Sequence, residues 1–380
     1  MDSSQQQAIN ISGAGPAGLA AAVVIAEQGR QAAIYEKHDD VGHRFHGDFQ
    51  GLENWTTNQD VLEEFVSLGI KTNFDHLPIH ELTIYGPGGT QRTVSSQQPL
   101  LYLIRRGPQT GSLDDALKQQ VQQCGAEIRF SQTIDAMPNG GIVTHGPHRA
   151  DVIAVGYLFE TDMPDGLYMA VADELAPKGY AYLVIWNGRG TIASCMFDDF
   201  HQEKQYLERT VEFFTDKTGL QMQSPSHFGG TGNFQIPETA HKGDILYAGE
   251  SAGFQDPLFG FGIRSSILTG VAAAQALVRN DPGSYETFWK TRIRDIQRTG
   301  MVNRWFYERL GNNGYTRLIR NFPKDGDIRQ RMFNEYRPKL WKSLWYQLIK
   351  RNKKRLFCIT PGCECTWCRC ARCVPEGGLP

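Results

Sequence analysis

The sequence lacks any apolar run of about 20 residues, the length that a helix needs to cross a bilayer. We therefore expect no transmembrane helix. The first seven residues, Met1 to Gln7, contain no Lys or Arg, so the start does not match a secretory signal. These absences predict a cytoplasmic protein.

The sequence also has little net charge, −2 over 380 residues, and we expect no nucleic-acid partner. The small total hides an asymmetry. Residues 290–373 contain 21 Lys and Arg against six Asp and Glu, whereas the rest of the chain contains 18 and 35. Such a basic block is typical of a region that contacts an anionic surface, and it is equally compatible with a solvated helical surface.

Glycine is abundant, with 40 residues, and the strongest motif is a Gly-rich turn near the start. Residues 8–12 resemble a short buried strand, Gly13 to Gly18 follow, and an apolar helix is expected over residues 19–27. A second strand is expected over residues 31–35 and ends at Glu36. This strand–turn–helix–strand order is the context that a dinucleotide-binding fingerprint requires.

Each position of the fingerprint has a physical role. Gly13 permits the tight turn, Gly15 lets backbone N–H groups approach a pyrophosphate, and Gly18 lets the helix pack closely on the strand. Glu36 lies 18 residues after Gly18, where a carboxylate binds a ribose hydroxyl pair and disfavours the 2′-phosphate of NADP. The candidate nucleotide-binding residues are Gly13, Gly15, Pro16, Ala17, Gly18, Glu36 and Lys37.

A second segment favours FAD over NAD. Residues 243–253 resemble a strand that ends in a small-residue turn, and an apolar helix is expected over residues 263–278. An acidic residue at such a strand end binds ribityl hydroxyls, and a Gly-rich helix start stabilises negative charge on the flavin N1/O2 edge. That charge grows when flavin is reduced. The candidate flavin-binding residues here are Gly249, Glu250, Gly260, Phe261 and Gly262.

The fingerprint, the segment Gly249 to Gly253 and the turn Pro257-x-x-Gly260-x-Gly262 together resemble the geranylgeranyl reductase family over residues 8–280. That family lies within a larger group of flavoproteins that includes aromatic hydroxylases and halogenases. The resemblance implies an α/β fold, with a doubly wound Rossmann-type FAD domain, an inserted β-rich catalytic domain and a helical C-terminal region. It also implies hydride transfer from reduced flavin to C=C bonds of an apolar, isoprenoid-type substrate.

The sequence departs from the family pattern at two places. Gly249-Glu250 stands where the group usually has Gly-Asp, and the Arg-containing helix start is stretched by a Gly-Pro-containing insertion before Leu113-Asp114. The resemblance still makes Arg106 a candidate to contact the cofactor. Arg44, in the loop between Gly42 and Gly47, is a second candidate.

The same resemblance divides the chain into four parts, of which the first is an FAD domain. Within this first part, residues 151–156 resemble the strand that returns to the nucleotide sheet. No second G-x-G-x-x-G follows a strand, so NAD(P)H, if it is the electron donor, is expected to bind transiently at the flavin face. The parts are an FAD domain (1–75, 100–158 and 240–280), a β-rich substrate domain (76–99 and 159–239), a helical basic region (281–357) and a Cys-rich tail (358–380).

The residues over the flavin decide the reaction. The stretch Gly179 to Trp186 lacks the Phe-Pro of family reductases and the Trp-x-Trp-x-Ile-Pro of halogenases. The missing halogenase motif argues against a halogenase. Tyr180 and Tyr182 alternate onto one strand face, where they line an apolar slot or simply pack the sheet. Cys195 is a further lining candidate, or else a small buried apolar residue.

No Ser-His-Asp or paired-carboxylate arrangement is evident in the sequence, so the catalytic residues are left unassigned. The favoured function is an FAD-dependent oxidoreductase that reduces C=C bonds of an apolar substrate. The alternatives are an NAD(P)H-dependent flavin monooxygenase and a non-catalytic FAD-binding interaction protein. The oligomeric state is left open.

The basic region contains an apolar helical stripe after Pro338, and five Lys and Arg follow or end it between residues 350 and 355. Such a helix either packs on the body or lies on an anionic membrane, where Trp suits the interface. The stripe is Leu340, Trp341, Leu344, Trp345, Leu348 and Ile349.

Six of the eight cysteines fall within the 16 residues from Cys358 to Cys373. In a cytosolic chain this density indicates metal binding or redox thiols rather than a disulfide scaffold. Four thiolates suit zinc or an Fe–S cluster, and a loose tail with reducible thiols stays open. The candidate ligands are Cys363, Cys365, Cys368, Cys370 and Cys373.

Overall fold

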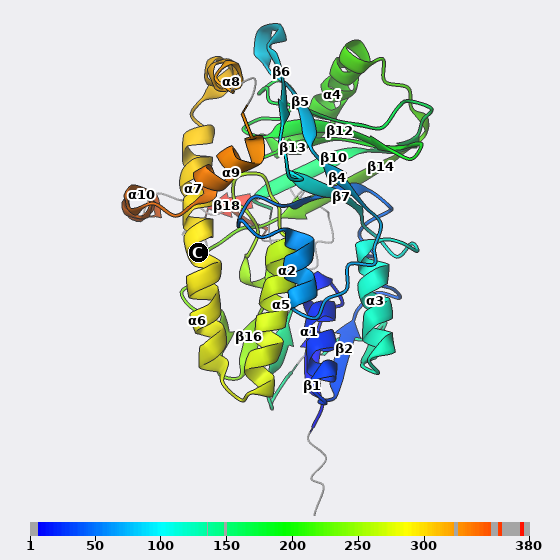
Figure 1. Cartoon of the computed structure of the whole chain (residues 1–380), viewed down its shortest axis with the longest axis vertical. Coiled ribbons are helices and arrows are strands. Elements are labelled where there is room, and N and C mark those ends of the chain that lie inside the picture. Colours follow the sequence, from blue (N-terminus) through cyan, green and yellow to red (C-terminus); the bar gives the residue numbers. More distant parts are fainter. Residues whose placement is uncertain are drawn as a thin grey trace, which may run out of the picture.

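The computed structural model describes residues 7–134, 136–147, 150–322, 326–350, 356–358 and 373–375. Two sheets follow one another along the long axis of the molecule, and helices run beside both (Figure 1). A six-stranded sheet lies in the lower half of the figure, and a seven-stranded sheet lies in the upper half.

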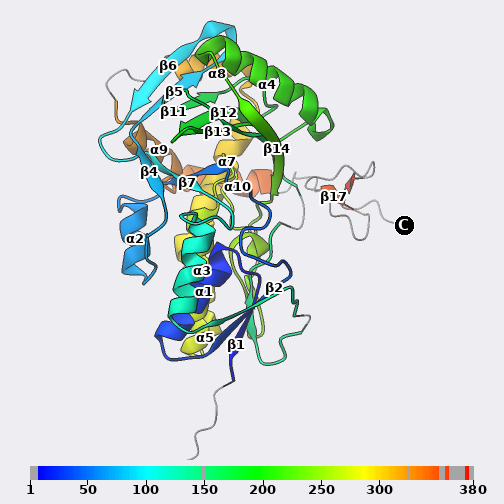
Figure 2. The same ribbon diagram turned by 90° about the vertical axis from the view of Figure 1, so that its right-hand side faces the viewer.

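The lower sheet is parallel except for its edge strand β15. The helices α1, α3 and α5 lie on one side of it, and α1 packs against the other two (Figure 2). Ile11, Leu19 and Ile34 are fully buried between these layers, as the apolar runs of the sequence require. In spatial order the strands are β15 (His241–Lys242), β16 (Ile245–Tyr247), β9 (Gly141–Val143), β1 (Ile9–Ser12), β2 (Ala32–Glu36) and β8 (Glu127–Phe130), and the helices are α1 (Pro16–Glu27), α3 (Leu113–Gln123) and α5 (Ile263–Val278).

The strand that returns to this sheet is β9 and not residues 151–156, so that prediction is wrong. β9 pairs with β1 on one side and β16 on the other. Residues 152–160 instead form β10 (Val152–Glu160) in the upper sheet. The three residues Gly-Ile-Val of β9 are too short to show a strand pattern, whereas the long apolar run of β10 shows one clearly.

The upper sheet combines two distant parts of the sequence. Strands from residues 81–95 pair with strands from residues 152–232, because β5 aligns in parallel with β11. Along β12, Leu183 and Ile185 face α4 (Glu203–Thr218), while Val184 and Trp186 face the nucleotide half. The strands, in spatial order, are β14 (Gln223–Gly232), β10, β13 (Arg189–Met196), β12 (Tyr180–Trp186), β11 (Gly166–Ala170), β5 (Glu81–Tyr85) and β6 (Gln91–Ser95).

A small antiparallel sheet lies between these two halves (Figure 2). Its strands are β3 (Phe49–Glu53), β7 (Leu101–Arg105) and β4 (His76–Ile79), and α2 (Val61–Ser67) follows β3. The Phe49 N–H donates to Thr191 Oγ1 over 3.1 Å, which ties β3 to the upper sheet.

The C-terminal helices connect both halves. The Tyr307 hydroxyl donates to the Gly179 carbonyl over 2.7 Å, and the Tyr336 hydroxyl donates to Asp256 Oδ2 over 2.8 Å. Arg304 donates to the Leu258 carbonyl over 2.9 Å. Residues 282–322 and 326–349 are therefore packed on the body. They form α6 (Pro282–Arg292), α7 (Arg294–Tyr307), α8 (Gly311–Arg320), α9 (Ile328–Tyr336) and α10 (Leu340–Lys350).

No helix within the described residues is long and apolar enough to cross a membrane. In the tail, β17 (Leu356–Cys358) pairs antiparallel with β18 (Cys373–Pro375), with Cys358 opposite Cys373. Cys363, Cys365, Cys368 and Cys370 lie outside the described residues, so the predicted metal site stays a prediction. The predicted α/β fold, with a Rossmann-type domain, an inserted β-rich part and C-terminal helices, is confirmed.

Candidate functional site

The Gly-rich turn adopts the conformation that the fingerprint predicts. Gly13 has a φ of +105°, a region that favours glycine, and a Cβ on Gly18 would lie 2.0 Å from the Gly13 carbonyl oxygen. A Cβ on Gly15 would meet nothing within 4 Å. The backbone at Gly15 therefore borders open space at the N-terminus of α1, where N–H groups and the helix dipole favour an anion.

Glu36 is fixed beside this turn at the end of β2. One carboxylate oxygen accepts from the Ala14 N–H over 2.8 Å, and the other accepts from the His38 N–H over 3.0 Å. Both bonds hold the carboxylate at the edge of the open space beside Gly15, as a ribose-binding residue requires. Lys37, the next residue, is exposed.

The two predicted flavin segments meet, although about 230 residues separate them in the chain. A Cβ on Gly249 would lie 3.1 Å from the Ala17 Cβ, and a Cβ on Gly270 of α5 would lie 2.1 Å from the Ala17 carbonyl oxygen. Small residues at these positions let α5 cross α1 closely, so both helices begin at the same site.

The turn before α5 is held by its own hydrogen bonds. The Asp256 N–H donates to the Phe261 carbonyl over 2.6 Å, and Gln255 Nε2 donates to the Gly260 carbonyl over 2.7 Å. Gly260 has a φ of +81°, and Gly262 caps the N-terminus of α5. This rigid turn presents a helix N-terminus that stabilises negative charge.

The two candidate arginines take different partners. Arg44 lies 3.0 Å from Glu250, half-exposed, and bridges the two cofactor segments. Arg106 is buried and makes a double hydrogen bond to Asp114, over 2.8 and 2.9 Å. The inserted loop therefore preserves the Arg–Asp pair, and Arg106 also stacks on Phe45.

These residues fit an FAD. Glu250 Oε1 is buried with no hydrogen-bond partner in the described residues, and Gly15 borders open space. A bound FAD would satisfy both features, with its pyrophosphate at Gly15 and a hydroxyl group at Glu250. Gly260 and Gly262 would hold the flavin edge.

One face of β12 is aromatic and points toward the flavin turn. Tyr180 and Tyr182 are half-buried with ring centroids 6.3 Å apart, and Tyr180 lies 5.7 Å from Phe259 of the turn. The Tyr180 hydroxyl donates to the Phe259 carbonyl over 2.6 Å. Trp186 extends this aromatic face toward Phe49 of β3, 5.5 Å away.

Cys195 shares this face, because it is the cross-strand neighbour of Tyr180. The thiol is buried, and that burial raises its pKa to about 12. Burial likewise raises the pKa of Tyr180 and Tyr182 well above the usual value. All three groups are therefore neutral at physiological pH and can donate hydrogen bonds.

Sequence reasoning missed two buried carboxyl groups on the adjoining strand. Asp48 precedes β3, accepts from Gln50 Nε2 over 2.9 Å, and has its pKa raised by burial. It directly precedes Phe49, whose ring lies 5.5 Å from that of Trp186, so it borders the same region. Its place after Gly47, at the end of the loop that holds Arg44, was the available signal.

The second carboxyl group is Glu53, at the far end of β3. Burial raises its pKa to about 8, and its Oε2 has no hydrogen-bond partner in the described part of the chain. Glu53 lines a cavity of about 40 Å³ together with Trp55, which follows β3, and with Gln255 and Phe261 of the flavin turn.

A family model and a curated protein match this chain. Residues 11–51 match a family model described as an NAD(P)-binding Rossmann-like domain. The chain is 24% identical to a digeranylgeranylglycerophospholipid reductase of Methanosphaerula palustris, over 92% of this chain and 96% of that protein.

Solved structures show the same fold. A geranylgeranyl bacteriochlorophyll reductase-like protein of Thermoplasma acidophilum aligns with a TM-score of 0.70 and 18% identity, covering 89% of this chain and 98% of that one. A flavin-dependent brominase aligns with a TM-score of 0.62 and 13% identity, covering 90% and 98%. The predicted enzyme class, an FAD-dependent oxidoreductase, is supported, and the chain resembles the geranylgeranyl reductases, as its motifs indicated.

Proposed function

We propose that this chain is an FAD-dependent reductase that saturates C=C bonds of an apolar, isoprenoid-type substrate. The observation that carries the proposal is the aromatic face of Tyr180, Tyr182 and Trp186 opposite the flavin turn. Such a face binds an apolar chain and excludes water from it. The similarity to a reductase of geranylgeranyl lipids favours the same substrate class.

Bound FAD, when reduced, would supply the hydride, and the alkene also needs a proton. Asp48 is the carboxyl group best placed to hold that proton, since burial raises its pKa and it precedes Phe49, which contacts Trp186 of the aromatic face. Tyr182 and Tyr180 would orient the apolar chain along the aromatic face of β12. The hydride from reduced FAD would carry both electrons, and the proton would come from the protein, so that the C=C bond would gain two hydrogens in all.

An anaerobic single-turnover experiment tests the proposal. Protein reduced with dithionite is mixed with a geranylgeranyl alkene or with its fully saturated analogue, and flavin absorbance is followed. We expect reoxidation with the alkene alone, and a product two hydrogens heavier by mass spectrometry. NAD(P)H is then supplied in place of dithionite, to ask whether it is the donor.

The variant D48N should slow this reoxidation about 10²-fold, because an amide cannot supply the proton. Y157F is a matched control, because Tyr157 packs on the opposite face of the upper sheet, and its rate should stay unchanged. An inert alkene, combined with substrate-stimulated NAD(P)H consumption and oxygen incorporation in air, would establish a monooxygenase instead. A flavin that neither reagent reduces would indicate a binding protein.

A further inference from the structure

The exposed apolar side chains of this protein gather in one place. Six of the seven exposed large hydrophobic residues in the described chain lie on α10 or near the end of α7; the seventh, Val66, is on α2. We name the six the α10 patch. They are Phe306, Leu310, Leu340, Trp341, Leu344 and Leu348.

The helix α10 is apolar on two faces, and only one of them is covered. Trp345, Tyr346 and Ile349 pack against the side that holds α7, where Trp305 lies 5.4 Å from Trp345. Lys342 is buried on the same side and donates to Asn303 Oδ1 over 2.7 Å. The single apolar stripe that the sequence predicted is thus divided between two faces of α10. The residues of the covered face anchor the helix on α7.

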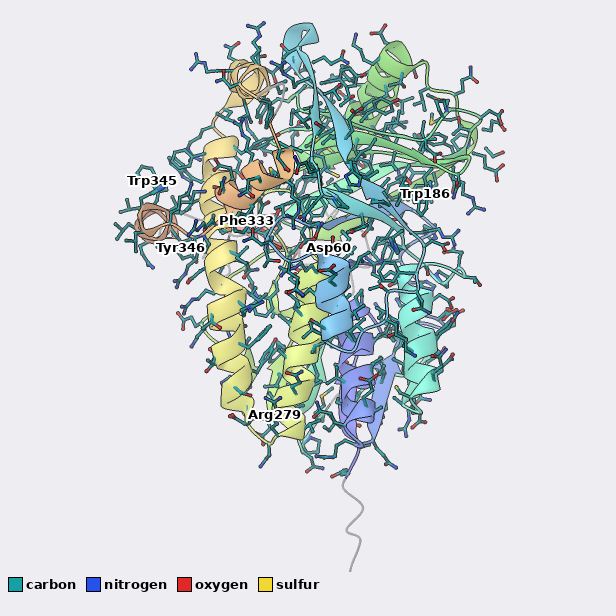
Figure 3. All side chains as sticks on the ribbon, in the orientation of Figure 1. Asp60, Trp186, Arg279, Phe333, Trp345 and Tyr346 are labelled. Atoms are coloured by element: carbon teal, nitrogen blue, oxygen red, sulfur yellow. The ribbon has the colours of Figure 1, made fainter. Side chains whose placement is uncertain are left out.

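The other half faces away from the body. Leu340, Leu344 and Leu348 recur every four residues and are 88%, 71% and 60% exposed, and Trp341 is 48% exposed. Figure 3 shows α10 at the edge of the molecule, with Trp345 and Tyr346 labelled on it. A contiguous apolar patch left exposed in this way marks an interaction surface, so the bare face needs an occupant.

The positive charge of the segment around the patch indicates what kind of partner would cover it. Residues 336–363 contain eight Lys and Arg and no Asp or Glu, and seven of the eight remain once Lys342, which is buried and paired with Glu335, is set aside. An isologous dimer would bring this basic segment against its own copy, and like charges repel. The sequence after Cys358 contains only four large apolar residues, which are Ile359, Trp367, Val374 and Leu379. Four such side chains are too few to cover the six residues of the α10 patch well.

We propose that the α10 patch docks this protein on the surface of an anionic lipid membrane. Leucine and tryptophan on one face would enter the interface, and the flanking basic residues would lie beside acidic headgroups, as in helices that rest in the plane of a bilayer. The proposal does not depend on the reaction at the flavin.

Vesicle sedimentation of the full-length protein tests it. We expect binding to phosphatidylcholine vesicles that contain phosphatidylglycerol, and much weaker binding to phosphatidylcholine alone. Raising the ionic strength from about 0.1 M to about 1 M shortens the Debye length from about 10 to about 3 Å and should weaken binding.

The variant L340S/L344S/L348S should weaken binding about 10³-fold, because each of the three lost leucine burials is worth about tenfold. V66S removes the one exposed large apolar residue that lies outside the patch in the described part of the chain, and it should bind like the parent protein. All four substituted side chains are exposed, so flavin content and circular dichroism should not change.

Three results would overturn the proposal. The first is equal binding to both vesicle types, or none. The second is a dimer that the triple variant dissociates, without vesicle binding by the parent protein, which would make the patch a subunit interface. The third is binding only after truncation behind Arg355, which would show that the tail covers the patch in the full chain.

Discussion

Glu53 should make this protein less stable as pH rises, and Glu53→Gln should remove that dependence. Its carboxyl group is buried, its Oε2 has no hydrogen-bond partner in the described residues, and burial raises its pKa from 4.5 to about 8. Between these two values the folded chain holds a proton that the unfolded chain has lost. The folded state therefore binds more protons, and stability falls as pH rises through that window.

The size of the effect follows from the shift. At 1.36 kcal/mol per pKa unit, the shift corresponds to at most about 5 kcal/mol above pH 8 and roughly 3 kcal/mol at pH 7. Glutamine has nearly the same shape and no proton to lose. The gain in unfolding free energy of E53Q should be near zero at pH 4.5 and grow until about pH 8.

Urea unfolding of the FAD-loaded protein at pH 5, 6, 7 and 8 measures this gain. Glu64→Gln is the matched control, since Glu64 is equally buried but accepts from Arg264 over 2.7 and 2.9 Å. E64Q leaves a buried arginine unpaired and should destabilise by about 3–5 kcal/mol. A difference between E53Q and the parent that stays constant with pH would refute the reasoning.

Two further predictions concern the cofactor and the tail. Gly15→Val should fold but lose FAD, because its side chain would occupy open space at the α1 N-terminus, whereas Gly18→Val should not fold, because its Cβ would clash with Gly13. Absorbance at the flavin band and circular dichroism distinguish the two outcomes. A yellow G15V protein would contradict the proposed site. Truncation after Arg355 should remove bound zinc or iron and leave FAD in place, since four thiolates hold such metals tightly. Elemental analysis of the full-length and truncated proteins measures the metal. A full-length protein without metal would make the tail a redox or unstructured segment.

The cofactor site was predictable because its requirements are local. Gly13, Gly15 and Gly18 act through backbone conformation and close approach, and each is set by residues within a few positions. The second segment could be recognised for the same reason, as a strand end followed by a helix start. Long helices such as α5 were predicted with the bounds that the structure shows, since sixteen residues give a clear period.

Short elements and divided faces were not predictable. β9 has three residues, and its place in the sheet depends on β1 and β16 on either side. In α10 the sequence placed Leu344 and Trp345 on one stripe, but the position of α7 decides which of them is covered. Periodicity gives the faces of a helix, while packing partners give their environment.

The reaction is the hardest property to derive, for a related reason. Asp48 precedes β3, whereas Tyr182 and Cys195 lie on two strands of the upper sheet, and no spacing in the sequence relates the three. Their chemistry depends on shared burial, which raises all three pKa values. An aromatic face beside a buried carboxyl group of raised pKa suits delivery of a proton to an apolar alkene better than binding of a charged substrate. The D48N experiment therefore tests the one property that only the folded chain creates.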